Sequence, residues 1–459
     1  MLAVAALLLA GCSSDDGLLL TDPAATGEAI VLDVKEVKSP ETRADQQKGT
    51  MTFTTLKTTG FGVYGYEGAY NSSSSVPTLF KTGANTKVFF EAGGTDPTTL
   101  VVHPGSWKYA ETADLKLWET GKKYTFFAYA PYVTSDDFAA SGTSGINSVP
   151  TTDTAGDPTI GYTVATNPAQ SVDLLWGVRT AYTTSSGTTA SAGLPWIDIS
   201  KGETAAAVQF TFYHALCALG LHAQVMVDQG NDTDNLGDVS TLGTIGSADG
   251  CKVTLRSITI APKSEGTEFH QSGTLNLNNT TAHQPLWSTS GNTIASLILD
   301  NGAAGHGTID SKLLDPVAGT GENDDYYSSG TTLNMNGTQK DVMTNTAVPG
   351  ITETANTQTI IAGDNLFMLI PQDAQDYTVT VEYYMTYKTT GTDYHRQSFR
   401  GTATISNLEL AAGVKYYLNL VFGLTTFKVT VTANDWEETT NAVTIATETG
   451  TSASNSLAK

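Results

Sequence analysis

The chain has 459 residues, and because all-β domains run large we expect two domains. Its formal net charge is -22, from 46 acidic against 24 basic residues, which opposes binding to nucleic-acid phosphates or anionic lipid headgroups. Nucleic-acid partners are therefore excluded. Charged residues make up 15% and hydrophobic residues 40%, a mixture that favours exposed strands and loops around real cores over surface helices or global disorder.

The N-terminus begins with an apolar stretch that is too short to span a bilayer. Residues 8–12 read Leu-Leu-Ala-Gly-Cys and resemble a bacterial lipoprotein signal, in which the peptide is cut before the cysteine and the thiol is acylated. This pattern predicts a signal peptide over residues 1–11, lipidation of Cys12 and a lipid as the membrane anchor. The alternative is a truncated ordinary signal peptide with an incidental cysteine, which the missing Lys and Arg before the apolar stretch favour.

A strand is expected next, because apolar and polar side chains alternate from Ile30 through Leu32 and Val34. A polar stretch over residues 41–45 follows and contains Arg43.

Period-two alternation dominates the rest of the chain, and helical periodicity is scarce. Strands are predicted at 61–66, 124–130, 174–178, 208–227 with one break near Gly220, 253–260, 366–370, 377–387, 416–422 and 427–433. Long polar loops are predicted at 135–161, 183–193, 228–250 and 302–359. Many strands without helices between them indicate antiparallel sandwiches rather than a parallel α/β sheet.

Six short motifs in a fixed order resemble those of the Bacteroidetes fimbrillin family. They are FAYAP at 127–131, DLLW at 173–176, FTFYHAL at 210–216, LIPQ at 369–372, KYYLNL at 415–420 and DW at 435–436. The resemblance implies an all-β fold of two tandem transthyretin-like antiparallel β-sandwich domains. We place these domains at residues 44–200 and 201–440, with the boundary in the loop at 195–204.

The resemblance also implies a maturation step at the N-terminus. Residues 12–43 would form a leader strand, which a trypsin-like surface protease releases by cutting between Arg43 and Ala44. The vacated groove would then accept a donated strand from another subunit. The alternative is an ordinary loop arginine.

A C-terminal tail over residues 441–459 is the candidate donor strand, because Val443 and Ile445 alternate with smaller or polar residues. The tail can instead be the last strand of the second domain. The sequence is therefore compatible with a shaft, a tip or an anchor subunit.

The function that the resemblance implies is a structural subunit of type V fimbriae with a role in adhesion, not an enzyme. Its partners would be other fimbrial subunits, the outer membrane through the lipid, and surface glycans or proteins. Asp15 and Asp16 after the lipidated cysteine are similar to the signal that sends such lipoproteins to the cell surface. The alternative is a non-polymerising surface lipoprotein or tip adhesin that binds glycan or host ligand, with an exposed aromatic platform among Trp107, Trp118, Trp196 and Trp287.

The remaining candidate sites are isolated. Cys217 and Cys251 either form one disulfide or leave Cys217 as a small buried hydrophobe. His214 on its apolar strand is interpreted as a core histidine, and no cofactor or metal is expected. An aspartate cluster at 232–238 lacks oxygen ligands at the spacing that calcium needs. Thr154, within Asp153-Thr154-Ala155, resembles the Bacteroidetes O-glycosylation motif and is otherwise an ordinary loop threonine.

Overall fold

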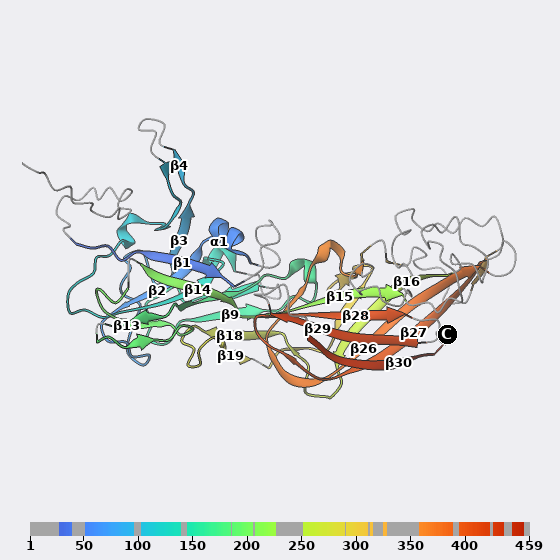
Figure 1. The fold of residues 1–459 in the computed structure, drawn as a ribbon. Helices are drawn as coiled ribbons and strands as arrows, with labels where there is room; N and C mark the ends of the chain where they lie inside the picture. Colours follow the sequence, from blue (N-terminus) through green and yellow to red (C-terminus); the bar gives the residue numbers. More distant parts are fainter. Residues whose placement is uncertain are drawn as a thin grey trace, which may run out of the picture.

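The computed structural model describes residues 27–38, 51–95, 102–138, 145–184, 186–204, 207–225, 251–289, 291–310, 313–314, 325–327, 358–388, 394–422, 426–435 and 443–453. Strands dominate these residues, which confirms the predicted all-β class. The molecule is elongated, with the N-terminal half at one end and the C-terminal half at the other (Figure 1). The described residues hold no helix with the length and apolar character that crossing a bilayer requires.

The first sheet has the strand order β1-β14-β10-β7-β2-β3-β6, and β13 also pairs with β7. Its strands are β1 (Leu32–Val37), β2 (Phe61–Glu67), β3 (Thr86–Glu91), β6 (Ser106–Tyr109), β7 (Tyr124–Ala130), β10 (Leu175–Arg179), β13 (Trp196–Ile199) and β14 (Val208–His214). Side chains of β7 are buried along its whole length, because one set of alternate residues enters each of the two hydrophobic cores that flank the sheet.

The second sheet has the order β22-β21-β16-β26-β27-β30-β29-β28-β15-β24, with β23 beside β27 and β25 beside β15. Its strands are β15 (Cys217–Val225), β16 (Cys251–Pro262), β21 (Leu297–Asp300), β22 (Gly307–Thr308), β23 (Asp325–Tyr327), β24 (Gln358–Thr359), β25 (Phe367–Leu369), β26 (Gln372–Lys388), β27 (Tyr394–Leu410), β28 (Val414–Phe422), β29 (Thr426–Asp435) and β30 (Val443–Ala453).

A smaller sheet joins the two halves near the middle of the molecule (Figure 1). Its order is β19-β18-β9-β8, with β8 (Gly145–Ser148) and β9 (Thr159–Thr163) from the first half and β18 (Ser272–Asn276) and β19 (Leu286–Thr289) from the second. We call it the bridging sheet. The Trp287 indole N–H also donates to the Ala215 carbonyl at 2.9 Å, at the point where the chain passes between halves.

The remaining elements are short. They are β4 (Gly94–Thr95) with β5 (Val102–His103), β11 (Tyr182–Thr183) with β12 (Thr189–Ala190), β17 (Phe269–His270) with β20 (Thr293–Ile294), α1 (Phe53–Thr59), η1 (Thr112–Asp114), η2 (Ser135–Asp137), η3 (Pro168–Gln170) and η7 (Ala362–Asp364). The helix α1 begins at a capping box, in which Thr52 and Thr55 exchange side-chain and backbone hydrogen bonds.

Two predicted features differ from the structure. The break in the segment 208–227 lies at Ala215 and Leu216 instead of Gly220, because β14 completes the first sheet and β15 starts the second there. The change of sheet therefore falls beyond the predicted boundary of 200/201. Pairing is also not wholly antiparallel, since β1 runs parallel to β14 and β15 runs parallel to β28.

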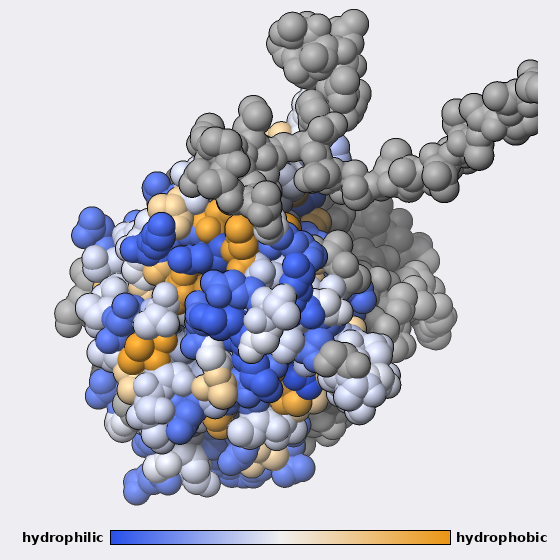
Figure 2. All heavy atoms as spheres, turned by 90° about the vertical axis from the view of Figure 1, so that its left-hand side faces the viewer, coloured by the Kyte–Doolittle hydropathy of each residue, from blue (hydrophilic) through white to orange (hydrophobic). Residues whose placement is uncertain are grey.

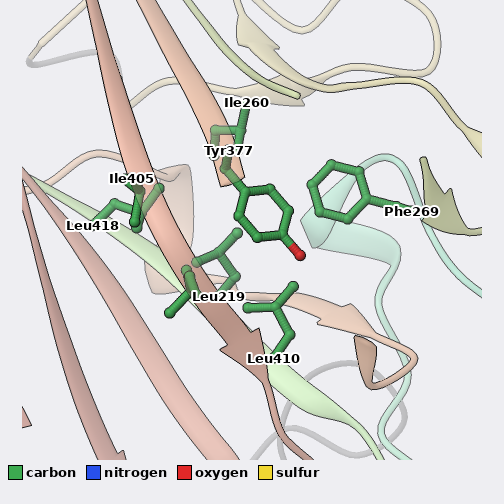
Figure 3. Close-up of a pocket in the computed structure, with 8 residues that line it drawn as sticks. Leu219, Ile260, Phe269, Tyr377, Ile405, Leu410 and Leu418 are labelled. Carbon is green, nitrogen blue, oxygen red and sulfur yellow. The ribbon is translucent and has the colours of Figure 1, made fainter. Parts of the chain in front are cut away.

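A small apolar cavity lies inside the second half (Figure 3). It is lined by Leu219, Ile260, Phe269, Tyr377, Ile405, Leu408, Leu410 and Leu418. The rings of Phe269 and Tyr377 stack at 5.5 Å, and the Tyr377 hydroxyl donates to the Gln372 amide oxygen. Because its lining is almost entirely hydrocarbon, the cavity is a packing void between strands.

We expect Leu418→Ala to lower the free energy of unfolding by about 2–5 kcal/mol, because it enlarges this void and removes a side chain that is only 1% exposed. Leu286→Ala is the matched control, since Leu286 is 38% exposed, and should change stability by less than ~0.5 kcal/mol. Urea unfolding followed by tyrosine and tryptophan fluorescence measures both. Equal effects of the two substitutions would contradict this account of the second core.

Candidate subunit interface

The strand β1 forms one edge of the first sheet and pairs with a single neighbour, β14. Leu32 lies opposite Val208, and Val34 lies opposite Phe210. One face of the β1 segment is buried: Ile30, Leu32, Val34 and Val37 are between 0% and 7% exposed and belong to the core of the first sheet. The predicted strand at Ile30 to Val34 is therefore present, and its apolar face closes that core.

A bulge interrupts the alternation along β1. Val34 pairs with Phe210 and Glu36 with Thr211, so Lys35 is the extra residue and points into solvent. The bulge turns the following side chain back, so that Val37 enters the core opposite Phe212. The inward residues of the segment 30–37, which are Ile30, Leu32, Val34 and Val37, are thus spaced by two, two and three positions.

The other side of the leader segment contacts the chain around η1. The Ile30 N–H donates to the Lys116 carbonyl at 2.7 Å, and the Trp118 N–H donates to the Glu28 carbonyl at 2.8 Å. The Tyr109 hydroxyl, on the opposite edge strand β6, donates to the Ile30 carbonyl at 3.0 Å. The segment 28–37 therefore spans the opening between the two edges of the sheet, and we call its position the β1 seat.

A buried hydrogen-bonded pair holds the chain at Met51, the first described residue after the segment 27–38. Asp173 and His214 are 0% and 2% exposed, and their Oδ2 and Nδ1 atoms are 2.7 Å apart. The Met51 N–H donates to the same Asp173 Oδ2 at 2.8 Å. His214 is therefore a core histidine as predicted. Burial lowers the pKa of the Lys415 ammonium, and the nearby Asp173 carboxylate opposes this shift.

Several predicted site residues lie outside the described residues, namely Cys12, Arg43, Ala44 and the aspartate cluster at 232–238. Thr154 is described, and it is exposed in the loop before β9. Val443 and Ile445 lie on β30, which pairs antiparallel with β29 along most of its length and meets β27 at Arg400 and Gly401. In this chain the predicted donor strand thus occupies a position in its own second sheet.

Of the two alternatives for Cys217, its surroundings fit the small buried hydrophobe better than the disulfide with Cys251. Cys217 is a free, fully buried thiol that donates to the Leu369 carbonyl at 3.5 Å. Burial raises the pKa of this thiol to about 12, so it stays protonated. Its environment is the apolar core at the start of β15, which matches the alternative of a small buried hydrophobe.

The predicted aromatic platform is not present among the described tryptophans. Trp107 and Trp118 are each 7% exposed, Trp196 is 1% exposed, and Trp287 is only partly exposed. Apolar residues form small separate patches among hydrophilic ones on the N-terminal end (Figure 2). Within the described ranges, no group of three or more His, Cys, Asp or Glu side chains is arranged to hold a metal ion.

The sequence is 30% identical over 242 residues to a fimbrium subunit, Fim1C, of Phocaeicola vulgatus. The match covers 51% of this chain and 53% of the relative, so the chain spans about half the length of the curated relative it matches. This similarity confirms the predicted resemblance to fimbrial proteins. No protein-family model matches the sequence.

Among solved structures, a fimbrial protein from Bacteroides vulgatus is 19% identical, with 89% of this chain and 99% of that chain covered and a TM-score of 0.48. The fimbrial anchor protein Mfa2 from Porphyromonas gingivalis is 9% identical, with 92% and 100% covered and a TM-score of 0.27. TM-scores of this size do not establish a common fold.

Removing the Asp173 carboxylate should destabilise the protein. We expect Asp173→Ala to cost about 2–4 kcal/mol, because the buried Met51 N–H loses its acceptor and His214 loses a hydrogen bond. Asp153→Ala, at an exposed loop position, is the control and should stay within ~0.5 kcal/mol. Urea unfolding gives both values, and hydrogen exchange at the Met51 amide should accelerate only in the first variant. Unchanged exchange at Met51 would contradict the assignment.

Proposed function

We propose that this chain, a relative of a Bacteroidetes fimbrium subunit, is a structural subunit of cell-surface fimbriae that accepts a strand from another subunit at the β1 seat. The observation that carries the proposal is the position of β1, an apolar strand at a sheet edge that closes a core and is joined to the rest of the chain through residues 39–50. An edge strand of this kind can be replaced by another strand with the same backbone hydrogen bonds.

Proteolysis supplies the switch in this proposal. While β1 is covalently attached, it rebinds its seat as an intramolecular partner at high effective concentration. After hydrolysis of the Arg43–Ala44 peptide bond, the leader competes with every other strand in solution. The cut therefore leaves the resting contacts unchanged and makes the strand exchangeable.

The distribution of arginines supports Arg43 as the processing site. The other arginines of the chain are Arg179 in β10, Arg256 in β16, and Arg396 and Arg400 in β27. The Arg179 guanidinium is also held by the carbonyls of Ser191 and Pro195. A protease binds its substrate as an extended chain, and a peptide already paired within a sheet is not available for this. The four described arginines therefore all lie in paired strands, whereas Arg43 belongs to the polar stretch at residues 41–45 of the sequence.

The C-terminal strand β30 is the proposed donor to a neighbouring subunit. Its ladder with β27 is confined to two residue pairs. Val443 and Ile445 would supply the inward side chains of the donated strand.

The remaining assignments belong to the same proposal. The chain would act in adhesion without enzymatic activity, as a lipoprotein anchored in the outer membrane through Cys12. The boundary between its two domains would lie at Ala215 and Leu216, where the chain passes from the first sheet to the second. The exposed Thr154 would be available for O-glycosylation. A glycan-binding lipoprotein is the less supported hypothesis, because the tryptophans proposed for its aromatic binding platform are largely buried.

An arginine-specific protease should cut the folded protein first after Arg43, leaving Ala44 as the new N-terminus. N-terminal sequencing identifies the cut, which Arg43→Ala should abolish and Arg179→Ala should not. The cut protein should then exchange its leader for a fluorescently labelled peptide of residues 28–39, whereas uncut protein should not. A first cut elsewhere, or a cut protein that takes up no peptide, would overturn the proposal.

Replacing the lipidated cysteine tests the anchor separately. Cys12→Ser should move the protein from the detergent phase to the aqueous phase in a detergent partition assay, because the acyl chain is the proposed membrane-binding group. Ser13→Ala keeps the cysteine and should stay in the detergent phase. If Cys12→Ser still enters the detergent phase, the lipid assignment is wrong.

A further inference from the structure

The β1 seat imposes a particular spacing on whatever strand fills it. Four inward positions are occupied by large apolar side chains, those of Ile30, Leu32, Val34 and Val37. The last step is three residues long because the bulge at Lys35 turns Val37 back into the core. A strand with plain alternation would instead direct its fourth apolar residue into solvent.

The wall of the seat is built from aromatic rings that pack against one another. Phe210 and Phe212, which lie opposite Val34 and Val37, are each 0% exposed. The ring of Phe61 contacts both of them edge-on, at 6.0 Å and 5.3 Å. Behind them Gly177 approaches closely, so that a Cβ at this position would lie 3.0 Å from the Phe212 ring. Rings packed in this way cannot easily shift to fit a different strand. The seat therefore accepts only a limited range of spacings between the apolar side chains of that strand.

This chain's own C-terminal segment does not carry the required pattern. Over residues 436–459, no alignment in either strand direction places more than two large apolar residues on the four inward positions. In the alignment that begins at Val443, the inward residues are Val443, Ile445, Thr447 and Gly450. Threonine and glycine would leave the positions of Val34 and Val37 polar or empty, with the aromatic wall uncovered.

We infer that the β1 seat selects a strand from a different subunit, one with four large apolar residues spaced by two, two and three positions, and rejects the C-terminal strand of a second copy of this chain. The inference rests on the proposed function, because it concerns the strand that replaces β1. Its consequence is that residues 436–459 of a second copy do not fill the seat, and that the strand which replaces β1 comes from a different subunit. Residues 441–459 of this chain would then be donated to the acceptor groove of a different subunit.

The test measures competition for the seat in the full chain cut after Arg43. The peptide of residues 28–39, labelled with a fluorophore, reports occupancy by fluorescence polarisation, and unlabelled peptides compete with it. We expect the tail peptide of residues 441–453 to bind about 100-fold or more weaker than the leader peptide, since two large side chains are missing from buried positions.

Two matched pairs of peptides separate spacing from general hydrophobicity. In the tail peptide, Thr447→Val with Gly450→Val restores the pattern and should tighten binding by about 10-fold or more, whereas Ala446→Val with Thr449→Val adds two valines off the pattern and should not. In the leader peptide, deletion of Lys35 should weaken binding by about 10-fold or more, and Lys35→Ala, which keeps the bulge, should not.

The outcomes distinguish this inference from the proposed function. If the leader peptide itself does not bind the seat, the proposed strand exchange and the inferred selectivity are both wrong. If the leader enters and the natural tail binds equally well, the selectivity is wrong while strand exchange stands. Equal affinities within either matched pair would show that spacing does not select the strand, and would overturn the inference as well.

Discussion

Contact between the apolar face of β1 and the aromatic interior of the first sheet is the constraint on which the rest of this half depends. The sheet has two edges, β1 and β6, and the Tyr109 hydroxyl reaches from one to the Ile30 carbonyl of the other. Without β1 the core between them would open to water along Phe210 and Phe212. Burial of each β1 side chain contributes about 1.5–3 kcal/mol, so any replacement strand must supply comparable contacts.

The bridging sheet limits how far such a change can spread. Two neighbouring strands come from each half, and the halves meet where β9 pairs with β18 over five consecutive residue pairs from Thr159 to Thr163. The indole of Trp287 also ties β19 to the connection at Ala215. The proposed strand exchange at β1 would therefore alter one edge of the first sheet and leave the junction between halves in place.

Sequence periodicity predicted the long strands because one buried face is enough to produce it, as at β7, β26 and β28. It could not predict the bridging sheet, since β8 and β19 are four residues long and fall in or beside polar stretches. The sequence also did not indicate that the strand breaks at Ala215, because the apolar run continues from β14 in the first sheet directly into β15 in the second. The alternation in the sequence predicted the apolar face of β1. It could not predict the bulge and the parallel pairing, because both depend on β14, which lies far away in the sequence.

The buried pair of Asp173 and His214 explains why loss of the leader need not unravel the new N-terminus. Met51 is the first described residue after the leader, and its N–H donates to the Asp173 carboxylate in the interior. The helix α1 begins two residues later at the capping box of Thr52 and Thr55, which are also buried. Backbone groups that are satisfied inside the protein are costly to expose. The chain is therefore fixed on the mature side of the proposed cut by contacts that do not involve β1, so the leader can leave and the fold beyond Met51 can stay.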